Sequence, residues 1–122
     1  CFAEKQGYSK FGSYTGNGST NGTFVYTGFK PSFVLIKNTS ASGQSWRLTD
    51  NKRFGYNPKN IMLYPNLSNA ESTSELTIDY LSNGFKIRAT DSGVNGSGNT
   101  LIYMAFAENP FTSSAGTPVT AR

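Results

Sequence analysis

Residues 75–90, ELTIDYLSNGFKIRAT, show the clearest strand pattern in the chain. In the first half, three apolar side chains share one face of an extended segment: Leu76, Ile78 and Tyr80. The second half alternates again, and its inward-facing residues are Phe85, Ile87 and Ala89. Between the halves, the dipeptide Asn83-Gly84 tolerates positive φ in a tight turn. The stretch therefore predicts a β-hairpin with one buried face.

The rest of the chain also favours short strands. Six further segments have strand character, each bounded by Gly, Asn, Ser or Pro: residues 10–15, 23–27, 33–37, 45–49, 61–64 and 100–108. Residues 33–36 and 101–106 are apolar on both faces, which places them at the centre of a sheet or at a subunit interface and predicts a buried Phe106. We therefore expect an all-β fold, an antiparallel β-sandwich of jelly-roll or lectin-like type with about eight strands.

The composition of the chain excludes several classes of function. The chain has 122 residues, which suits one domain, and its net charge of +4 is spread without a cationic cluster, so nucleic acid is not an expected partner. No apolar run is long enough for membrane insertion. Histidine is absent and the single cysteine is Cys1, which removes the commonest general base and the usual zinc ligands. We expect no cofactor, no metal and no enzymatic activity.

Residues 46–57 combine the only tryptophan with cations, a carboxylate and amides. A sugar-binding surface needs an aromatic ring beside planar hydrogen-bonding groups. The candidate receptor-binding residues are therefore Trp46, Asp50, Asn51, Arg53 and Tyr56. Asn95 and Asn99, in a glycine-rich loop, are candidates for a second wall of the same binding site. In the alternative interpretation, Trp46 fills the core and Asp50 pairs with Arg53 or Lys52 to pin a long loop.

An ordered set of motifs runs through the chain from about residue 10 onward: YTGNG at 14–18, FVYTGFKPSFVLIK at 24–37, Trp46 with DNKR at 50–53, YN at 56–57, LSNGFK at 81–86 and IYMAFAE at 102–108. Together they resemble a β-rich module of uncharacterised function. Such modules recur in tail-fibre and other virion-surface proteins of tailed bacteriophages, especially marine ones. The ending TPVTAR at 117–122 is similar to the usual C-terminus of these modules.

The resemblance implies a C-terminal module that is displayed on a virion surface, outside the host cell. Phe2-Ala3-Glu4 repeats Phe106-Ala107-Glu108, and preceding modules of that kind tend to close on such a strand. Residues 1–9 are therefore expected to be the end of a preceding module and a linker, and residues 10–122 a single β-sandwich domain. The resemblance transfers no catalytic residues.

Three functions remain open at this point. The leading hypothesis is a structural and adhesive module of a phage fibre or decoration protein, self-associating with a trimer favoured, which contacts a host-surface glycan or other virion proteins. The second is a glycan-degrading depolymerase domain. The third is a purely architectural subunit of a capsid or filament. Glycan binding, reducing-sugar release, or neither would distinguish them.

Overall fold

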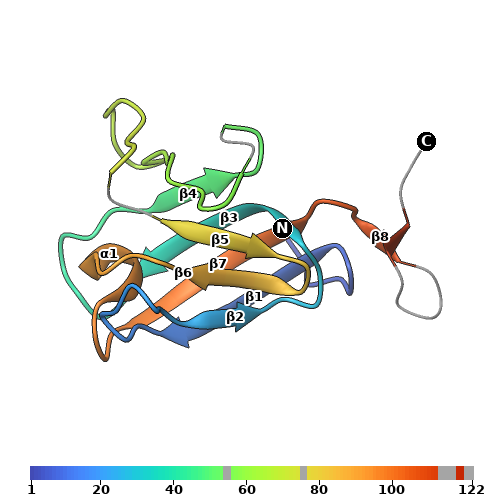
Figure 1. Cartoon of the computed structure of the whole chain (residues 1–122), viewed down its shortest axis with the longest axis horizontal. Helices are drawn as coiled ribbons and strands as arrows, with labels where there is room; N and C mark the ends of the chain where they lie inside the picture. Colours follow the sequence, from blue (N-terminus) through green and yellow to red (C-terminus); the bar gives the residue numbers. More distant parts are fainter. Residues whose placement is uncertain (54–55, 75–76, 113–117, 120–122) are drawn as a thin grey trace.

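The computed structural model describes residues 1–53, 56–74, 77–112 and 118–119, and it shows two antiparallel sheets packed face to face (Figure 1). The four-stranded sheet has the order β1 (Ser9–Thr15), β7 (Thr100–Ala107), β3 (Pro31–Asn38) and β4 (Arg47–Asp50). The three-stranded sheet has the order β2 (Phe24–Tyr26), β6 (Gly84–Ile87) and β5 (Ile78–Leu81). A short helix, α1 (Ser92–Asn95), and a small pair, β8 (Phe111–Thr112) with β9 (Pro118–Val119), complete the described elements. The predicted antiparallel sandwich is confirmed, with seven strands in its two sheets.

The core lies between the sheets. Phe85 of β6 is fully buried, and its ring meets the rings of Tyr14 and Tyr103 at centroid distances of 6.2 and 5.4 Å. The other inward-facing apolar residues of the strands pack around this aromatic group: Val25, Val34, Ile36, Ile78, Tyr80, Ile87, Leu101 and Ala105. The period-two pattern of the sequence therefore points one face of each strand into a common interior.

The two segments that are apolar on both faces form β3 and β7, and they lie at the centre of the four-stranded sheet, as predicted. Phe106, however, lies on the outer face of this sheet and is only partly buried, so its expected place in the core is wrong. Its ring contacts four other rings edge to face: Phe2, Tyr8, Phe11 and Phe33. Neighbouring rings on the outer face thus shield part of Phe106 from water without the second sheet.

The first eight residues lie against the sandwich. Phe2 contacts Phe106 at 5.7 Å between ring centroids, and Glu4 forms an ion pair of 2.7 Å with Lys10. The N–H of Ala107 donates a hydrogen bond to the carbonyl of Tyr8, which extends the pairing beyond β1. These contacts join residues 1–8 to the ends of β1 and β7.

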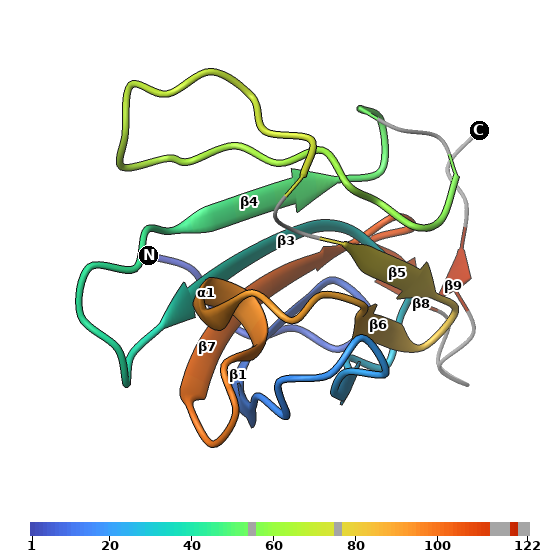
Figure 2. The same cartoon turned by 60° about the vertical axis from the view of Figure 1, so that its left-hand side comes forward.

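Residues 61–64 do not form the predicted strand. Met62 pairs with Ser72 and Leu63 with Leu48, each through an isolated bridge. Figure 2 shows that the chain after β4 instead runs as a long loop above the edge of the four-stranded sheet. The apolar character of this segment reflects burial of Met62, which is fully buried in the core, rather than a continuous ladder.

The predicted hairpin is confirmed, but its turn works differently. β5 and β6 pair in register from Ile78↔Ile87 to Leu81↔Gly84, so Ser82 and Asn83 form the turn. Gly84 is not among the described residues with positive φ, so its predicted role in the turn is wrong. Glycine is required there because a Cβ would stand 2.0 Å from the carbonyl oxygen of Val25 in β2. Residues 75 and 76, which include Leu76 of the predicted hairpin, lie outside the described residues.

Candidate functional site

The loop that follows β4 is pinned by Asp50 and Arg53. The Asp50 carboxylate accepts hydrogen bonds from the N–H groups of Lys52 and Arg53 at 2.8 and 2.9 Å, and pairs with the Arg53 guanidinium at 3.0 Å. Arg53 also pairs with Glu71 across the loop. Burial would raise the pKa of Asp50, but the hydrogen bonds from Arg53 and Lys52 outweigh it and lower the pKa. The loop-pinning interpretation of these residues is confirmed.

Asp50→Ala is expected to lower the free energy of unfolding by about 1 kcal/mol at neutral pH, because the loop N–H groups lose their acceptor. Since the pKa of Asp50 is lowered in the fold, its contribution is complete above the ordinary aspartate pKa and is lost as the pH falls through the lowered value. Urea unfolding at neutral pH and at about pH 2 measures this. Asp50→Asn, which keeps an acceptor oxygen, should cost less. A loss of equal size at both pH values would contradict the assignment.

Trp46 lies at the other end of β4 from Asp50, about 13 Å of strand away. Its side chain is 36% exposed, so the alternative in which it fills the core is wrong. It lines a shallow apolar groove on the outer face of the four-stranded sheet with Phe11, Leu35, Ile102 and Met104. Trp46 therefore does not share a surface with the residues that follow β4.

Asn95 and Asn99 do not form a second wall. Asn95 is fully buried in α1, and its amide nitrogen donates to Asn17, Ser19 and Ala89. Asn99 precedes β7, whereas Asn51 follows β4. Because β7 and β4 are both antiparallel to β3 between them, they run in the same direction, and these two asparagines lie at opposite ends of the sheet.

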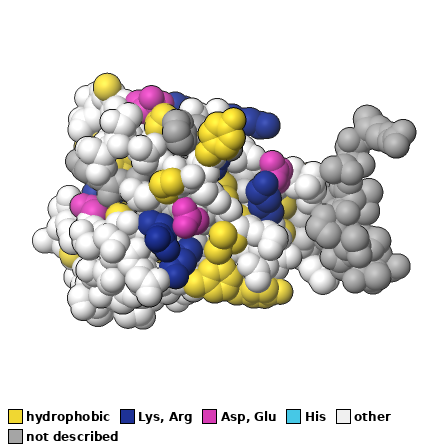
Figure 3. All heavy atoms as spheres, in the orientation of Figure 1, with side chains coloured by type: hydrophobic (Ala, Val, Ile, Leu, Met, Phe, Trp, Pro, Cys, Tyr) yellow, Lys and Arg dark blue, Asp and Glu magenta, His cyan; other side chains and the backbone are white. Residues whose placement is uncertain are grey.

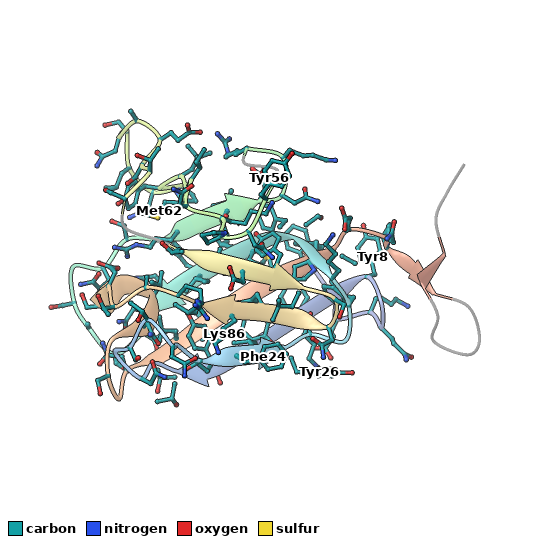
Figure 4. The ribbon with its side chains drawn as sticks, viewed as in Figure 1. Tyr8, Phe24, Tyr26, Tyr56, Met62 and Lys86 are labelled. Carbon is teal, nitrogen blue, oxygen red and sulfur yellow. The ribbon has the colours of Figure 1, made fainter. Side chains whose placement is uncertain are left out.

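A polar pocket of about 350 Å³ opens at the end of the sandwich where β4 and β7 end and β3 begins. We call it the lysine pocket. Its lining residues come from five parts of the chain: Lys30, Asn51, Lys52, Asn57, Lys59, Tyr80 and Glu108. Of the residues predicted for binding, Asn51 lines it, and the highly exposed Tyr56 (79%) stands next to Asn57 in the loop after β4 (Figure 4).

One side of the lysine pocket is a charged pair joined to an amide. Lys30 precedes β3 and Glu108 follows β7, and their charged groups are 2.9 Å apart. The N–H of Glu108 donates to the carbonyl of Lys30, and the Asn51 amide donates to the Glu108 carboxylate at 3.1 Å. The pairing of β3 with β7 thus places three side chains that are far apart in sequence on one wall.

The other side is formed by the loop after β4 and by β5. The Asn57 amide donates to the Tyr80 carbonyl at 2.8 Å and accepts the Tyr80 N–H at 3.0 Å. Lys59 exchanges two backbone hydrogen bonds with Ile78, and its residue is only 5% exposed. Burial lowers the pKa of the Lys59 ammonium and Lys30 lowers it further, whereas Glu108 and Asp50 oppose this.

The lysine pocket therefore presents ammonium donors and amides around a solvent-accessible space, whereas the Tyr80 hydroxyl is buried and donates to the Thr49 carbonyl. Sequence reasoning missed six of its members as binding residues: Lys30, Lys52, Asn57, Lys59, Tyr80 and Glu108. No local signal marks them, and only the pairing of Pro31 with Ala107 shows that Lys30 and Glu108 are neighbours. Among the described residues, no group of three or more His, Cys, Asp or Glu side chains is arranged to hold a metal ion.

A second exposed group lies on the outward face of the three-stranded sheet. Phe24 and Tyr26 of β2 lie there, with Lys86 of β6 opposite Phe24 (Figure 4). Figure 3 shows hydrophobic side chains beside cationic ones on this side of the molecule. A Cβ built on Gly84 would lie 3.2 Å from the Phe24 ring. A Cβ built on Gly28 would lie 3.6 Å from the Tyr26 hydroxyl oxygen. The Phe24 ring thus covers a glycine of the central strand β6, which gives this ring a structural role.

Comparison with known proteins places the chain in a family. No helix in the described part of the chain has the length and apolarity that a membrane crossing requires. Neither the curated proteins nor the solved structures contain a match to the chain. A family model described as a domain of unknown function, DUF7483, matches residues 1–110. The match covers most of the 122 residues, and the chain therefore belongs to the DUF7483 family.

Proposed function

We propose that this domain is a non-enzymatic adhesive module, the C-terminal part of a phage fibre or virion decoration protein, and that it contacts a host-surface glycan. The virion-surface assignment rests on the resemblance of the sequence motifs. Glycan contact is supported by one observation, the lysine pocket, where ammonium and amide groups surround a space at one end of the sandwich. Sugar hydroxyls accept and donate hydrogen bonds to such groups, and the exposed Tyr56 ring nearby offers a stacking surface.

Binding is favoured over glycoside hydrolysis by the carboxylates of this site. Glycosidases generally place two carboxyl groups across a cleft. The described lining of the lysine pocket has one, Glu108, and it is already engaged by Lys30 and Asn51. Nearby Asp50 is held by Arg53 and by backbone N–H groups. These carboxylates serve the structure of the site and leave no pair for acid–base chemistry there.

A single site of this kind is expected to bind weakly, with a dissociation constant on the order of 1 mM, or about −4 kcal/mol. Repetition of the module, for which we propose a self-associated trimer, would make such an affinity useful, because each further contact is intramolecular. Other virion proteins are the remaining proposed partners.

Tyr56→Ala is expected to weaken glycan binding at least several-fold while the melting temperature stays unchanged, because this side chain is 79% exposed. Binding of the whole chain to a glycan array, followed by titration of the best ligand, measures the first effect, and thermal unfolding the second. Lys86→Ala is the matched control, since it removes a surface side chain on the face of the three-stranded sheet.

Three outcomes would contradict the proposal. Wild-type protein that binds no glycan would favour the architectural subunit. Release of reducing sugar from a bound polysaccharide would favour the depolymerase. Equal losses for Tyr56→Ala and Lys86→Ala would move the binding surface away from the loop after β4.

A further inference from the structure

We infer that the lysine pocket recognises a single oxyanion, the carboxylate or sulfate of an acidic sugar, with Lys30, Lys52 and Lys59 as its cationic contacts. The identity of the carrier as a sugar rests on the proposed function, whereas the recognition of an oxyanion rests on the pocket itself. Three observations support the inference: the charge of the pocket, the burial of Lys59 and the fixed positions of the two asparagines.

The lining of the lysine pocket carries an excess of positive charge. Three lysines line it against one carboxylate, Glu108, so positive charge is in excess there. Lys30 pairs with Glu108, and Lys52 and Lys59 add two further positive charges to the lining. An excess of like charge in a concave site raises the local concentration of anions. The pocket is therefore suited to a negatively charged ligand.

Burial of Lys59 supports the same ligand. Its residue is 5% exposed and lines the pocket, so an anion that enters the pocket meets this lysine where little water competes for it. The pKa of Lys59 is lowered first by this burial and then by Lys30, so both effects disfavour its charged form. A bound oxyanion would favour the charged form of Lys59.

The asparagines hold the walls in place before a ligand arrives. Asn57 is fixed by two hydrogen bonds to the backbone of Tyr80, and Asn51 by its bond to Glu108. Such second contacts preorganise a binding site. The volume of about 350 Å³ lies near the lower end of the range for small-molecule pockets, roughly 300–1,000 Å³, which fits one sugar unit.

The test titrates the whole chain with three probes and follows backbone amide signals by NMR. The probes are glucuronate, which carries a carboxylate on a sugar, glucose, which is its neutral counterpart, and sodium sulfate, a free oxyanion. Glucuronate is expected to shift the signals of Asn51, Lys59 and Tyr80, sulfate to shift them at higher concentration, and glucose to leave them unchanged.

Substitutions of single lysines test whether the pocket lysines bind the anion. Lys59→Met keeps the length of the aliphatic stem and removes the charge, and it is expected to weaken glucuronate binding about tenfold, with thermal unfolding to confirm that the variant folds. Lys52→Met should weaken binding about tenfold as well, and its exposed side chain keeps the test valid if Lys59→Met fails to fold. Lys86→Met is the control for net charge, and it should retain wild-type affinity.

The outcomes separate the two proposals. Equal shifts by glucose and glucuronate would overturn the oxyanion inference and leave glycan binding standing. Shifts by sulfate alone would support the oxyanion site and count against glycan binding. No shift by any probe at these residues, or an equal loss for Lys86→Met and Lys52→Met, would overturn the inference.

Discussion

Phe85→Ala is expected to lower the free energy of unfolding by about 4 kcal/mol, the largest effect of any substitution considered for this protein. The Phe85 side chain is fully buried between the two sheets, and its ring meets Tyr14 of β1 and Tyr103 of β7 edge to face. Alanine would leave a cavity that the two flanking tyrosines fill poorly, because each is held in a sheet. Urea unfolding monitored by tryptophan and tyrosine fluorescence measures the change.

Phe106→Ala is the matched control. It removes the same side chain from the outer face of the four-stranded sheet, where Phe106 is only partly buried among other rings. Its expected cost is about 1–2 kcal/mol, because solvent can reach the space that it leaves. If Phe106→Ala proved as costly as Phe85→Ala, the outer face would have to be covered in solution, for example by a second copy of the chain.

Gly84→Val is expected to cost about 3 kcal/mol, because β2 approaches β6 too closely for any side chain at this position. A Cβ at Gly84 would lie 2.0 Å from the carbonyl oxygen of Val25 and 3.0 Å from its carbonyl carbon. Backbone atoms cannot move aside as a flexible side chain can, so β2 must shift away from β6. The Val25↔Phe85 pairing would be disturbed, and with it one face of the core. Chemical unfolding measures the loss, and amide hydrogen exchange in β2 locates it.

Gly43→Ala separates this steric cause from backbone strain. Gly43 has φ of 73°, but a Cβ there would have no heavy atom within 4 Å. Its expected cost is about 1 kcal/mol, which is that of a left-handed conformation alone. Gly84→Ala is expected to lower the free energy of unfolding more than Gly43→Ala does, although Gly84 is not among the described glycines with positive φ. The reverse order would show that close approach of β2 is not what requires glycine at position 84.

The sequence by itself determined the strand character of this protein. Alternation of apolar and polar residues is a property of neighbouring positions, and it predicts that Ile78 and Tyr80 face the same way whatever the rest of the chain does. The doubly apolar segments were assigned to the centre of a sheet for the same local reason, and β3 and β7 lie there. The Asp50–Arg53 pair could also be anticipated, because the two residues are three positions apart.

The tertiary structure decided what those strands bring together. Trp46 and Asp50 looked like parts of one surface because they are four positions apart, but the extended strand between them places them at opposite ends of β4. Lys30, Lys59 and Glu108 are distant in sequence and line one pocket only because β7 pairs with β3 and residue 59 bridges to β5. Likewise, Gly84 is required by a neighbour in β2, almost sixty residues earlier, and not by its own turn. Alternation depends on adjacent residues, whereas strand order and register depend on long-range pairing, and a binding site made from several strand ends is specified only by the latter.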